Sequence, residues 1–599
     1  MKSNNIIFIF IIIFLTNCNN QNNLNGGVSS TSSIASQVGI DILKKGGNAF
    51  DAIVATGFTL AVTSPSNGNL GGGGFLVAHI KDKGAISLDF REKAPEASYE
   101  TMFLDENQQY SRELALNSHK SSGVPGTVNG LIKIFNDYGS GNFTLEEIMA
   151  PAIYYAENGH EINSNAASGF DYYKSLFFRD TGSTKIFIKD VTDEMINAKD
   201  NYISGQISTE EYSVTLASMD EWKPGDLLVQ KDLALTLKRI AKNGNSGFYD
   251  GVTAELIVDE MKANDGFISK QDLLNYDSIY RQPIIGTYRG NKIISMGPPS
   301  SGGALLIQML NMIENFDVAS IERNSTKFVH LLTEVQRLAY ADRAIHLGDP
   351  DFWPSPISML ISKDYAKNRL ELISMDTATR SKDIAGGKNI PKESVETTHY
   401  SAMDNQGNIV GITTTLNMSY GSKKVVDGAG FLLNNEMDDF ASKPGVANAF
   451  GLVGIGIPPA NAIQPFKRPL SSMSPTIVVD KNNNPILTLG AAGGSRIITA
   501  VLQTIISVLD HDLTIQEAID EPRTHSQWLP DNIRYEQNAL SEQVIRELEA
   551  LNHIFIHDGN VETGIYSLAQ THGVQFKNDK FISGFDKRGR YDKNEGITY

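Results

Sequence analysis

Thr397-Thr398-His399-Tyr400-Ser401 separates a polar run that contains glycine and proline from a strand pattern. The run covers residues 385–396, and the strand pattern continues through a turn at 405–408 into a second strand at 409–416. If the bond before Thr397 is cut, that residue gains a free α-amine beside its own hydroxyl, so it supplies both a nucleophile and a base. A threonine pair also suits an ordinary strand, and taken alone that interpretation is favoured.

The composition is that of a globular protein with a large core. The chain has 599 residues, of which 41% are hydrophobic and 20% charged. Its formal net charge of -17 leaves no basic stripe for the phosphates of a nucleic acid, so we expect no such partner. The 11 histidines are scattered without an H-E-x-x-H pattern, and one cysteine cannot form a disulfide or a cysteine-rich metal site. The sequence therefore predicts neither a cofactor nor a metal ion.

The first residues have the pattern of a bacterial lipoprotein signal. Lys2 is followed by an apolar run at 6–15, which is too short to span a bilayer but suits the core of a secretory signal. Cys18 is the single cysteine, and it lies where such a signal places the residue that is acylated. We therefore expect residues 1–17 to be removed and the protein to be exported to the periplasm. The expected membrane attachment is a lipid on Cys18 alone.

Three hairpin patterns and several helical patterns indicate the architecture. The hairpins cover 75–80 with 85–91, then 400–416, then 476–479 with 485–490. Helical patterns cover 33–45, 48–62, 326–346 and 497–509, and the last is apolar almost all round. Hairpins flanked by helices predict a layered α+β fold. The first and third hairpins could share one sheet system across the loop before Thr397, so independent domains are not implied.

Two glycine-rich segments are candidates for a site. The run at 67–74 lacks the Gly-Lys-Ser/Thr of a phosphate loop, so it predicts either close backbone packing or the lining of a site, and no nucleotide. Gly493 and Gly494 lead from a strand pattern into the helix at 497–509. Consecutive glycines there can expose backbone N–H groups, as an oxyanion hole requires, or can form only a turn.

Charged and hydroxyl residues give further candidates, each with a plain alternative. Arg91 ends the first hairpin and is either a carboxylate clamp or, on spacing alone more often, a surface ion-pair partner. The acidic segment 434–440 could hold an ammonium group or form a solvated loop. Ser471 and Ser472 offer hydroxyls in a constrained loop, although serines in such a loop can also serve only to cap turns. No G-x-S-x-G elbow is present, which disfavours a conventional serine hydrolase.

Together these motifs resemble the γ-glutamyltranspeptidase family over roughly residues 28–540. The resemblance implies an N-terminal-nucleophile hydrolase with a four-layer αββα sandwich and no cofactor. It also implies self-cleavage before Thr397 into a large subunit, 18–396, and a small catalytic subunit, 397–599, which together form one structural unit. The segments that carry it are 37–44, 46–49, 67–74, 89–92, 297–303, 397–401, 434–440, 467–475, 493–496 and 527–530.

The resemblance also implies a reaction. Thr397 would attack the γ-glutamyl amide of glutathione or a related compound, and the acyl group would pass to water or to the amine of an amino acid or dipeptide. A free α-amine, with a reference pKa of about 7.7–8.0, is a suitable base for this attack. Thr415 would hydrogen-bond Thr397, and Gly493 and Gly494 would supply the oxyanion N–H groups.

By the same resemblance, two groups of residues would bind the substrate. The α-carboxylate would be held by Arg91, Ser471 and Ser472, and the α-ammonium by Asn417, Glu436 and Asp439. A cation then meets the carboxylate and anions meet the ammonium.

Phe450 departs from the family pattern, because many bacterial members carry tyrosine in this lid region. Without the phenolic OH one gating hydrogen bond to the Asn417 region is lost, and we expect a looser lid.

Two alternatives stay open on the sequence. A glutaryl-type cephalosporin acylase takes substrates that lack the α-ammonium, so Glu436 and Asp439 favour the glutamyl interpretation. A non-catalytic exported binding lipoprotein would keep the fold without the chemistry. The presence of Thr397, Thr415 and the glycine pair argues against that second alternative.

Overall fold

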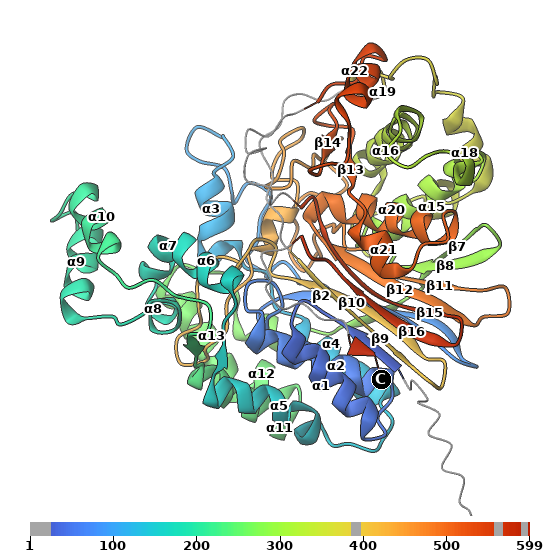
Figure 1. The fold of residues 1–599 in the computed structure, drawn as a ribbon. Coiled ribbons are helices and arrows are strands. Elements are labelled where there is room, and N and C mark those ends of the chain that lie inside the picture. The colour runs from blue at the N-terminus through green and yellow to red at the C-terminus, as the bar shows by residue number, and fades with distance from the viewer. Residues whose placement is uncertain (1–25, 385–396, 556–566, 589–596, 599) are drawn as a thin grey trace, which may run out of the picture.

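The computed structural model describes residues 26–384, 397–555, 567–588 and 597–598, which form two β-sheets between two helix layers (Figure 1). Cys18 and the run at 385–396 lie outside these residues. Neighbouring strands are antiparallel in both sheets. In order, the first sheet contains β17 (Ile597–Thr598), β1 (Gly26–Ser29), β9 (Thr398–Asp404), β10 (Ile409–Thr415), β2 (Gly73–Ile80), β3 (Gly84–Phe90) and β6 (Ile279–Arg281). The second contains β16 (Lys580–Phe585), β15 (Gln570–Lys577), β12 (Pro485–Ala492), β11 (Thr476–Val479), β8 (Asn291–Ser295) and β7 (Ile284–Tyr288).

Each sheet mixes strands from before and after Thr397. β9 pairs with β1 on one edge and with β10 on the other, and β10 pairs in turn with β2. In the second sheet, β8 pairs with β11. Neither part of the chain holds a complete sheet, so both parts form one structural unit, as predicted.

The three predicted hairpins are present as β2–β3, β9–β10 and β11–β12. The first and third hairpins share one sandwich but not one sheet, because β2–β3 and β11–β12 belong to different sheets. These sheets pack face to face through β9, β10 and β12. Strand periodicity reports which face of a strand is buried and not which neighbour it pairs with, so the pattern could not separate the two arrangements.

Helices cover the outer face of each sheet (Figure 1). The predicted helices are present within one or two residues of their expected bounds, and Asn48 closes a capping box with Asp51 at the start of α2. The helix at 497–509 is almost wholly buried, as its apolar pattern predicts. On the first sheet lie α1 (Ser33–Lys44), α2 (Ala49–Thr63) and α4 (Thr127–Tyr138); α5 (Leu145–Asn158) packs on the outside of α2, and α11 (Lys231–Asn243) packs on α5. On the second sheet lie α15 (Gly302–Ile313), α20 (Ile497–Leu509) and α21 (Ile515–Asp520), and α16 (Thr326–His346) packs on α15.

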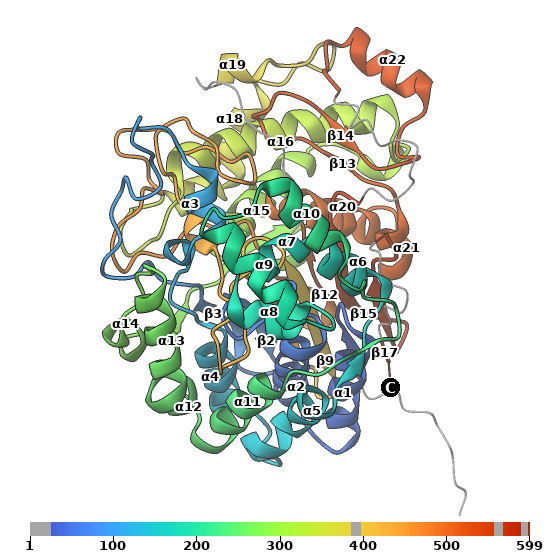
Figure 2. The ribbon, with the colours of Figure 1, turned by 90° about the vertical axis from the view of Figure 1, so that its left-hand side faces the viewer.

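The remaining elements surround this sandwich, and α9 and α10 project from one side of it (Figure 1), the side that faces the viewer in Figure 2. No helix in the described part of the chain is long and apolar enough to cross a membrane. The short strand pairs are β4 (His160–Glu161) with β5 (Leu227–Leu228) and β13 (Thr524–His525) with β14 (Arg534–Tyr535). The helices are α3 (Arg112–Asn117), α6 (Ser164–Tyr172), α7 (Lys174–Phe178), α8 (Thr181–Phe187), α9 (Asp193–Ile203), α10 (Thr209–Ala217), α12 (Ser246–Tyr249), α13 (Gly251–Ala263), α14 (Lys270–Leu274), α17 (Ile357–Leu360), α18 (Lys363–Leu370), α19 (Ser381–Ile384) and α22 (Glu542–Ala550).

The glycine run allows backbones to approach one another closely at the start of β2. A Cβ atom on Gly71 would lie 2.0 Å from the carbonyl oxygen of Leu432, and one on Gly72 would lie 2.1 Å from that of Thr415. These contacts are shorter than any side chain tolerates. The run therefore packs against the last residue of β10, Thr415, and against Leu432 further along the chain.

We predict that Gly72→Ala destabilises the protein by about 1–3 kcal/mol, because its Cβ must displace the Thr415 backbone. Gly68→Ala is the matched control from the same run, since its Cβ would meet its nearest atom at 3.3 Å. Urea-unfolding midpoints of the two variants and the wild type measure the effect. If the unfolding midpoints of Gly72→Ala and Gly68→Ala are equal, the close contact between Gly72 and the Thr415 backbone does not restrict the residue at position 72.

Candidate active site

Thr397 directly precedes β9 and is buried, with 3% of its surface exposed. Its neighbour Thr398 has a different environment: the Thr398 hydroxyl shares a 2.9 Å hydrogen bond with that of Thr31, near α1. Successive side chains of a strand point to opposite faces, which accounts for the difference. The two threonines of the pair are therefore not equivalent.

Thr397 lines a small cavity together with eight of the nine other residues that the resemblance assigns to the site. They come from the ends of β3 and β10 and from loops far apart in the chain. Arg91 and Asp439, for example, are 348 positions apart in sequence. Gly493 is the ninth, and it adjoins Gly494 of the lining. The cavity also contains Phe450, and the predicted residues in its wall are Arg91, Thr397, Thr415, Asn417, Glu436, Asp439, Ser471, Ser472 and Gly494.

The glycine pair forms the turn between β12 and α20. Gly493 has φ 148° and Gly494 has φ 57°, backbone conformations that residues with a side chain rarely adopt. The N–H of Arg496 donates to the carbonyl oxygen of Gly493 over 3.1 Å and closes the turn. A Cβ on Gly494 would lie 2.4 Å from the Phe450 ring. Phe450 thus packs directly on the candidate oxyanion turn.

Thr415 and Asn417 sit at the end of β10 and hold each other in place. The backbone N–H of Asn417 donates to Oγ1 of Thr415 over 2.8 Å, and Asn417 Nδ2 donates to the carbonyl oxygen of Asn435 over 2.9 Å. Asn417 has φ 74°, in the left-handed region that asparagine tolerates better than most residues. Its Oδ1 is buried without a hydrogen-bond partner among the described residues, so it can accept from a bound donor.

Arg91 is fully buried among carboxylates. Its Nη1 lies 2.5 Å from Glu436 Oε1, and its Nη2 donates to Asp439 Oδ2 over 2.5 Å. Glu92 lies 3.6 Å from the same guanidinium and has no hydrogen-bond partner on either oxygen in the part of the chain described. The Arg91 Nε donates to the carbonyl oxygen of Pro469, just before the serine pair. The plain surface interpretation of Arg91 is therefore wrong.

Burial and charge act against each other in this cluster. Burial opposes the charge on Arg91, but Glu436, Asp439 and Glu92 outweigh it and raise the pKa of Arg91. Burial raises the pKa of Glu436 well above its usual range, although Arg91 acts to lower it. Burial also raises the pKa of Asp439, and that of Glu92 to about 7, in both cases against Arg91. An added positive charge would therefore be favourable here.

Four further residues shape this site; Asn435 and Asp438 belong to the acidic segment 434–440 that the sequence marked as a candidate, whereas Arg343 gave no sequence signal. Glu92 follows Arg91 directly, and its place in the same motif was the only signal for it. Arg343 on α16 acts to lower the pKa of Asp439, and its own pKa falls to about 10 through burial. Asn435 accepts from the backbone N–H of Met418 as well as from Asn417. Asp438 accepts from the backbone N–H of Ala449 over 3.0 Å, and so connects the site to the loop that carries Phe450.

That loop, residues 448–452, is named the lid loop here. Asn448 Nδ2 donates to Asp439 Oδ1 over 3.1 Å, and Asn448 Oδ1 accepts from the backbone N–H of Phe450 over 3.0 Å. The Phe450 ring is buried in a small apolar cluster with Leu116 and Met418. The lid loop is thus attached to the site by polar contacts at its base and by apolar packing at Phe450.

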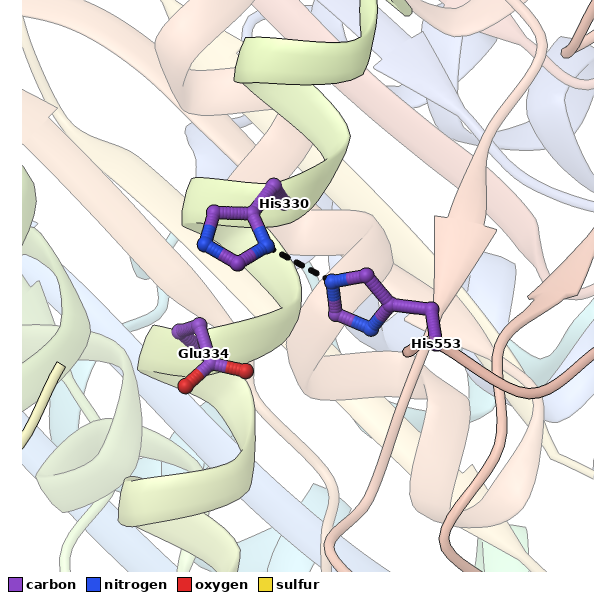
Figure 3. Close-up of side chains that lie close together, drawn as sticks. All are labelled: His330, Glu334 and His553. Carbon is purple, nitrogen blue, oxygen red and sulfur yellow. Dashed lines mark hydrogen bonds between the residues drawn. The ribbon is translucent and has the colours of Figure 1, made fainter. Parts of the chain in front are cut away.

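One buried group outside the cavity has the residue types of a metal site. His330 and Glu334 of α16 and His553 lie close together (Figure 3). His330 Nδ1 and His553 Nε2 share a 2.7 Å hydrogen bond, and the other ring nitrogen of His330 contacts the carbonyl oxygen of Ser374 at 2.8 Å. Glu334 is paired with Arg337. These contacts already engage the donor atoms and fit a structural tie between α16 and the chain after α22.

The fold and the site together define an N-terminal-nucleophile hydrolase: two antiparallel sheets lie between helix layers, and a threonine at the start of a central strand faces the cavity. The crystal structure of a cephalosporin acylase from Bacillus halodurans has the same fold. It matches with a TM-score of 0.76 over 96% of both chains, at 23% sequence identity.

The chain belongs to the γ-glutamyltranspeptidase family, whose family model, described as Gamma-glutamyltranspeptidase, matches residues 35–595. It is 43% identical over 526 residues to the glutathione hydrolase proenzyme of Escherichia coli (strain K12), covering 88% of this chain and 85% of that protein. The crystal structure of Helicobacter pylori γ-glutamyltranspeptidase is 41% identical and covers 61% of this chain and 96% of that one, with a TM-score of 0.53. The protein is therefore an enzyme of the γ-glutamyltransferase and glutathione hydrolase type.

Phe450→Tyr tests the expected effect of the lid on the reaction. We predict that the new hydroxyl donates to the buried Oδ1 of Asn417, tightens the lid loop and changes the ratio of transfer to hydrolysis. The ratio is measured with a γ-glutamyl donor in the presence and absence of glycylglycine. If the variant keeps the wild-type ratio, the missing hydroxyl has no part in the balance.

Proposed function

We propose that this enzyme cleaves its own chain before Thr397 and then transfers the γ-glutamyl group of glutathione and related amides through a threonyl acyl-enzyme. The acceptors are water, amino acids and dipeptides. The observation that carries the proposal is the convergence of a buried threonine, a glycine turn and a mixed set of charges on one cavity. Each of these elements has a separate task in acyl transfer.

In the proposed reaction, the α-amine of Thr397 takes the proton of the Thr397 hydroxyl as its oxygen attacks the γ-carbonyl carbon. The tetrahedral intermediate places its negative oxygen toward the N–H groups of Gly493 and Gly494, where donors stabilise developing charge most effectively. The C–N bond then breaks, the leaving amine takes the proton, and an ester remains on Thr397. Water or an acceptor amine attacks that ester by the same steps in reverse.

Thr415 would assist by hydrogen-bonding the Thr397 hydroxyl. The support for this is that both line the cavity and that the Thr415 hydroxyl is oriented by the backbone of Asn417. A nucleophile held by a fixed partner needs less reorganisation when it attacks.

Substrate recognition would be an exchange of ion pairs. In the structure, Arg91 contacts both Glu436 and Asp439. An α-carboxylate can share Arg91, with hydroxyls from Ser471 and Ser472. An α-ammonium can occupy the acidic side, because the pKa values of both acids are raised and a nearby cation lowers them. Each charge of the zwitterion therefore meets an existing opposite charge and is not buried alone.

The large subunit, 18–396, and the small subunit, 397–599, are proposed to stay together after cleavage as a heterodimer. Strands from both parts alternate in the two sheets, so separating them would expose the edges of β9 and β10 and the core between the sheets. An interface built like a domain core is characteristic of obligate partners.

A pair of anilides tests the proposed substrate. γ-Glutamyl anilide and glutaryl anilide differ only in the α-ammonium group, which the Glu436 and Asp439 side is proposed to bind. We predict that the kcat/KM of the wild type for the γ-glutamyl compound is at least about tenfold higher than for the glutaryl compound. This factor corresponds to the loss of one charged contact. Equal rates would favour a glutaryl acylase. Glycylglycine should increase release if dipeptides accept the acyl group.

Thr397→Ala tests the proposed nucleophile on a denaturing gel. The wild type should migrate as two fragments and the variant as one full-length band, because alanine has no hydroxyl to attack the preceding peptide bond. The variant should also lack anilide activity. A single uncut band in the wild type, unchanged by the substitution, would favour a binding protein that has kept the fold.

We further propose export to the periplasm and attachment to a membrane through an acylated Cys18. The support is the signal-like pattern of residues 1–18. Cys18→Ser should move the enzyme from the membrane fraction to the soluble fraction of cells and abolish incorporation of radioactive palmitate. Palmitate labelling that persists in the variant would contradict lipidation at this residue.

A further inference from the structure

Gln527 is buried between the candidate oxyanion turn and the lid loop, and its amide makes four hydrogen bonds. Its Oε1 accepts from the hydroxyl of Ser495 over 2.5 Å and from His525 Nε2 over 2.9 Å. Its Nε2 donates to the carbonyl oxygens of Phe450 over 3.3 Å and Leu529 over 3.2 Å. An amide side chain has two donors and two acceptor sites, so its capacity is fully used.

The surrounding contacts determine which way the amide faces. Burial lowers the pKa of His525 to about 3, so its ring is neutral. The Nδ1 of His525 shares a 2.8 Å hydrogen bond with the hydroxyl of Thr499 on α20, and its Nε2 faces Oε1 of Gln527. Both Nε2 bonds of Gln527 end on carbonyl oxygens, which cannot donate, so a flipped amide would lose these two contacts and place its oxygen against them. Its orientation is therefore set by hydrogen bonding.

Gln527 joins the candidate oxyanion turn to the lid loop. Ser495 directly follows Gly493 and Gly494. Phe450 carries the ring that packs on Gly494, where a Cβ would lie only 2.4 Å from it. The lid loop thus contacts the turn twice, once through the Phe450 ring and once through the Phe450 carbonyl and Gln527.

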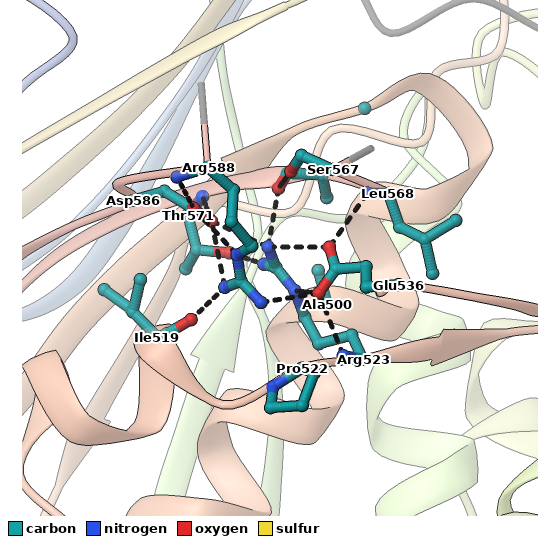
Figure 4. A network of polar contacts seen from close by, with 12 residues as sticks. Ala500, Ile519, Pro522, Arg523, Glu536, Ser567, Leu568, Thr571, Asp586 and Arg588 are labelled. Atoms are coloured by element: carbon teal, nitrogen blue, oxygen red, sulfur yellow. Dashed lines mark hydrogen bonds and ion pairs between the residues drawn. The ribbon is translucent and has the colours of Figure 1, made fainter. Parts of the chain in front are cut away.

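The opposite side of the turn is held rigidly. A Cβ on Gly493 would lie 3.0 Å from Ala569, whose carbonyl oxygen accepts from Arg523 over 2.7 Å. Arg523 belongs to a buried network of two arginines and two carboxylates (Figure 4). Its members are joined by ion pairs of 2.5–3.1 Å, and they are Arg523, Glu536, Asp586 and Arg588. The turn is therefore backed by this network at Gly493, whereas at Ser495 it is held by two contacts, the side chain of Gln527 and the Tyr340 hydroxyl that donates to the Ser495 carbonyl.

We propose that Gln527 is a positioning residue that couples closure of the lid loop to the geometry of Gly493 and Gly494. The 3.3 Å bond to the Phe450 carbonyl is the longest of the four and breaks first when the lid loop moves away. Gln527 then keeps only one of the two contacts that hold its donor end, the bond to the Leu529 carbonyl, and its hold on Ser495 weakens. The oxyanion N–H groups are fully aligned only when the lid loop is closed. This inference rests on the proposed function of the site.

Gln527→Met tests the proposal, because methionine keeps the length and removes all four hydrogen bonds. We expect kcat for γ-glutamyl anilide to fall by about tenfold to a hundredfold, since misplacing the oxyanion donors costs that much, with KM within about threefold of the wild type. Chymotrypsin should also cleave after Phe450 faster in the folded variant, because the lid loop has lost an anchor. Rates are expressed per mature active site, counted by the burst of aniline.

Gln503→Met is the matched control. Gln503 is also buried and makes three hydrogen bonds through its amide, with the backbones of Thr499 and Thr524, and none with Ser495 or Phe450. It should lose stability to a similar degree while kcat and the chymotrypsin rate at Phe450 stay within about threefold of the wild type. A kcat loss equal to that of Gln527→Met would overturn the positioning role, as would a Gln527→Met effect confined to KM.

Ser495→Ala keeps the proposal testable if Gln527→Met does not mature. It deletes only the hydroxyl that donates to Gln527, so kcat should fall in the same direction with KM unchanged. Where both fold, the double variant should resemble Gln527→Met alone, because the two residues act through one contact. Fully additive losses would contradict the coupling. An inactive wild type would instead refute the proposed function, before any variant is compared.

Discussion

The structure depends on a central strand, β9, that is hydrogen-bonded on both edges and starts one residue after Thr397. Its partners, β1 and β10, come from opposite sides of that residue in the sequence, so Thr397, the proposed nucleophile, is placed by contacts that both parts of the chain supply. β10 in turn delivers Thr415 and Asn417 to the cavity. The glycine run before β2 follows from the same constraint. A Cβ atom on Gly71 or Gly72 would lie about 2 Å from a carbonyl oxygen of Leu432 or Thr415, so only glycine fits there.

The charges of the cavity are arranged for binding more than for stability. One guanidinium faces three buried carboxylates, and both oxygens of Glu92 lack hydrogen-bond partners in the described chain. Buried ion pairs contribute little net stability, since desolvation offsets most of their attraction. An arrangement with excess negative charge and raised acid pKa values is instead suited to a ligand that brings a cation. In the proposed binding mode the carboxylate of the same ligand shares Arg91, so the arrangement of charges is complementary to a zwitterion.

Local pattern predicted the elements, and long-range packing decided the rest. The hairpins and the helices at 326–346 and 497–509 could be predicted because the twofold and 3.6-residue periods, with caps such as Ser325 at α16, are written in neighbouring residues. The assignment of the hairpins to the two sheets could not be predicted, since it depends on pairing between strands that are hundreds of positions apart. The site residues came from family resemblance: spacing alone favoured a surface Arg91. Arg343 was missed, and Gln527 was noted only as part of the segment 527–530, because the roles of both arise from contacts between distant segments.

The proposed acyl transfer imposes a requirement that explains why the candidate oxyanion turn should depend on the lid loop. The same N–H groups must stabilise the intermediate twice, once when the amine leaves and again when water or an acceptor arrives. Between these steps the cavity must open to admit the second nucleophile. If the turn stayed fully aligned while the cavity was open, water would hydrolyse the ester at once. If an open lid loop leaves Ser495 less well held through Gln527, the acyl-enzyme is least reactive while the cavity is open. An acceptor that lets the lid loop close again then restores the turn, and binding of the acceptor itself selects the outcome.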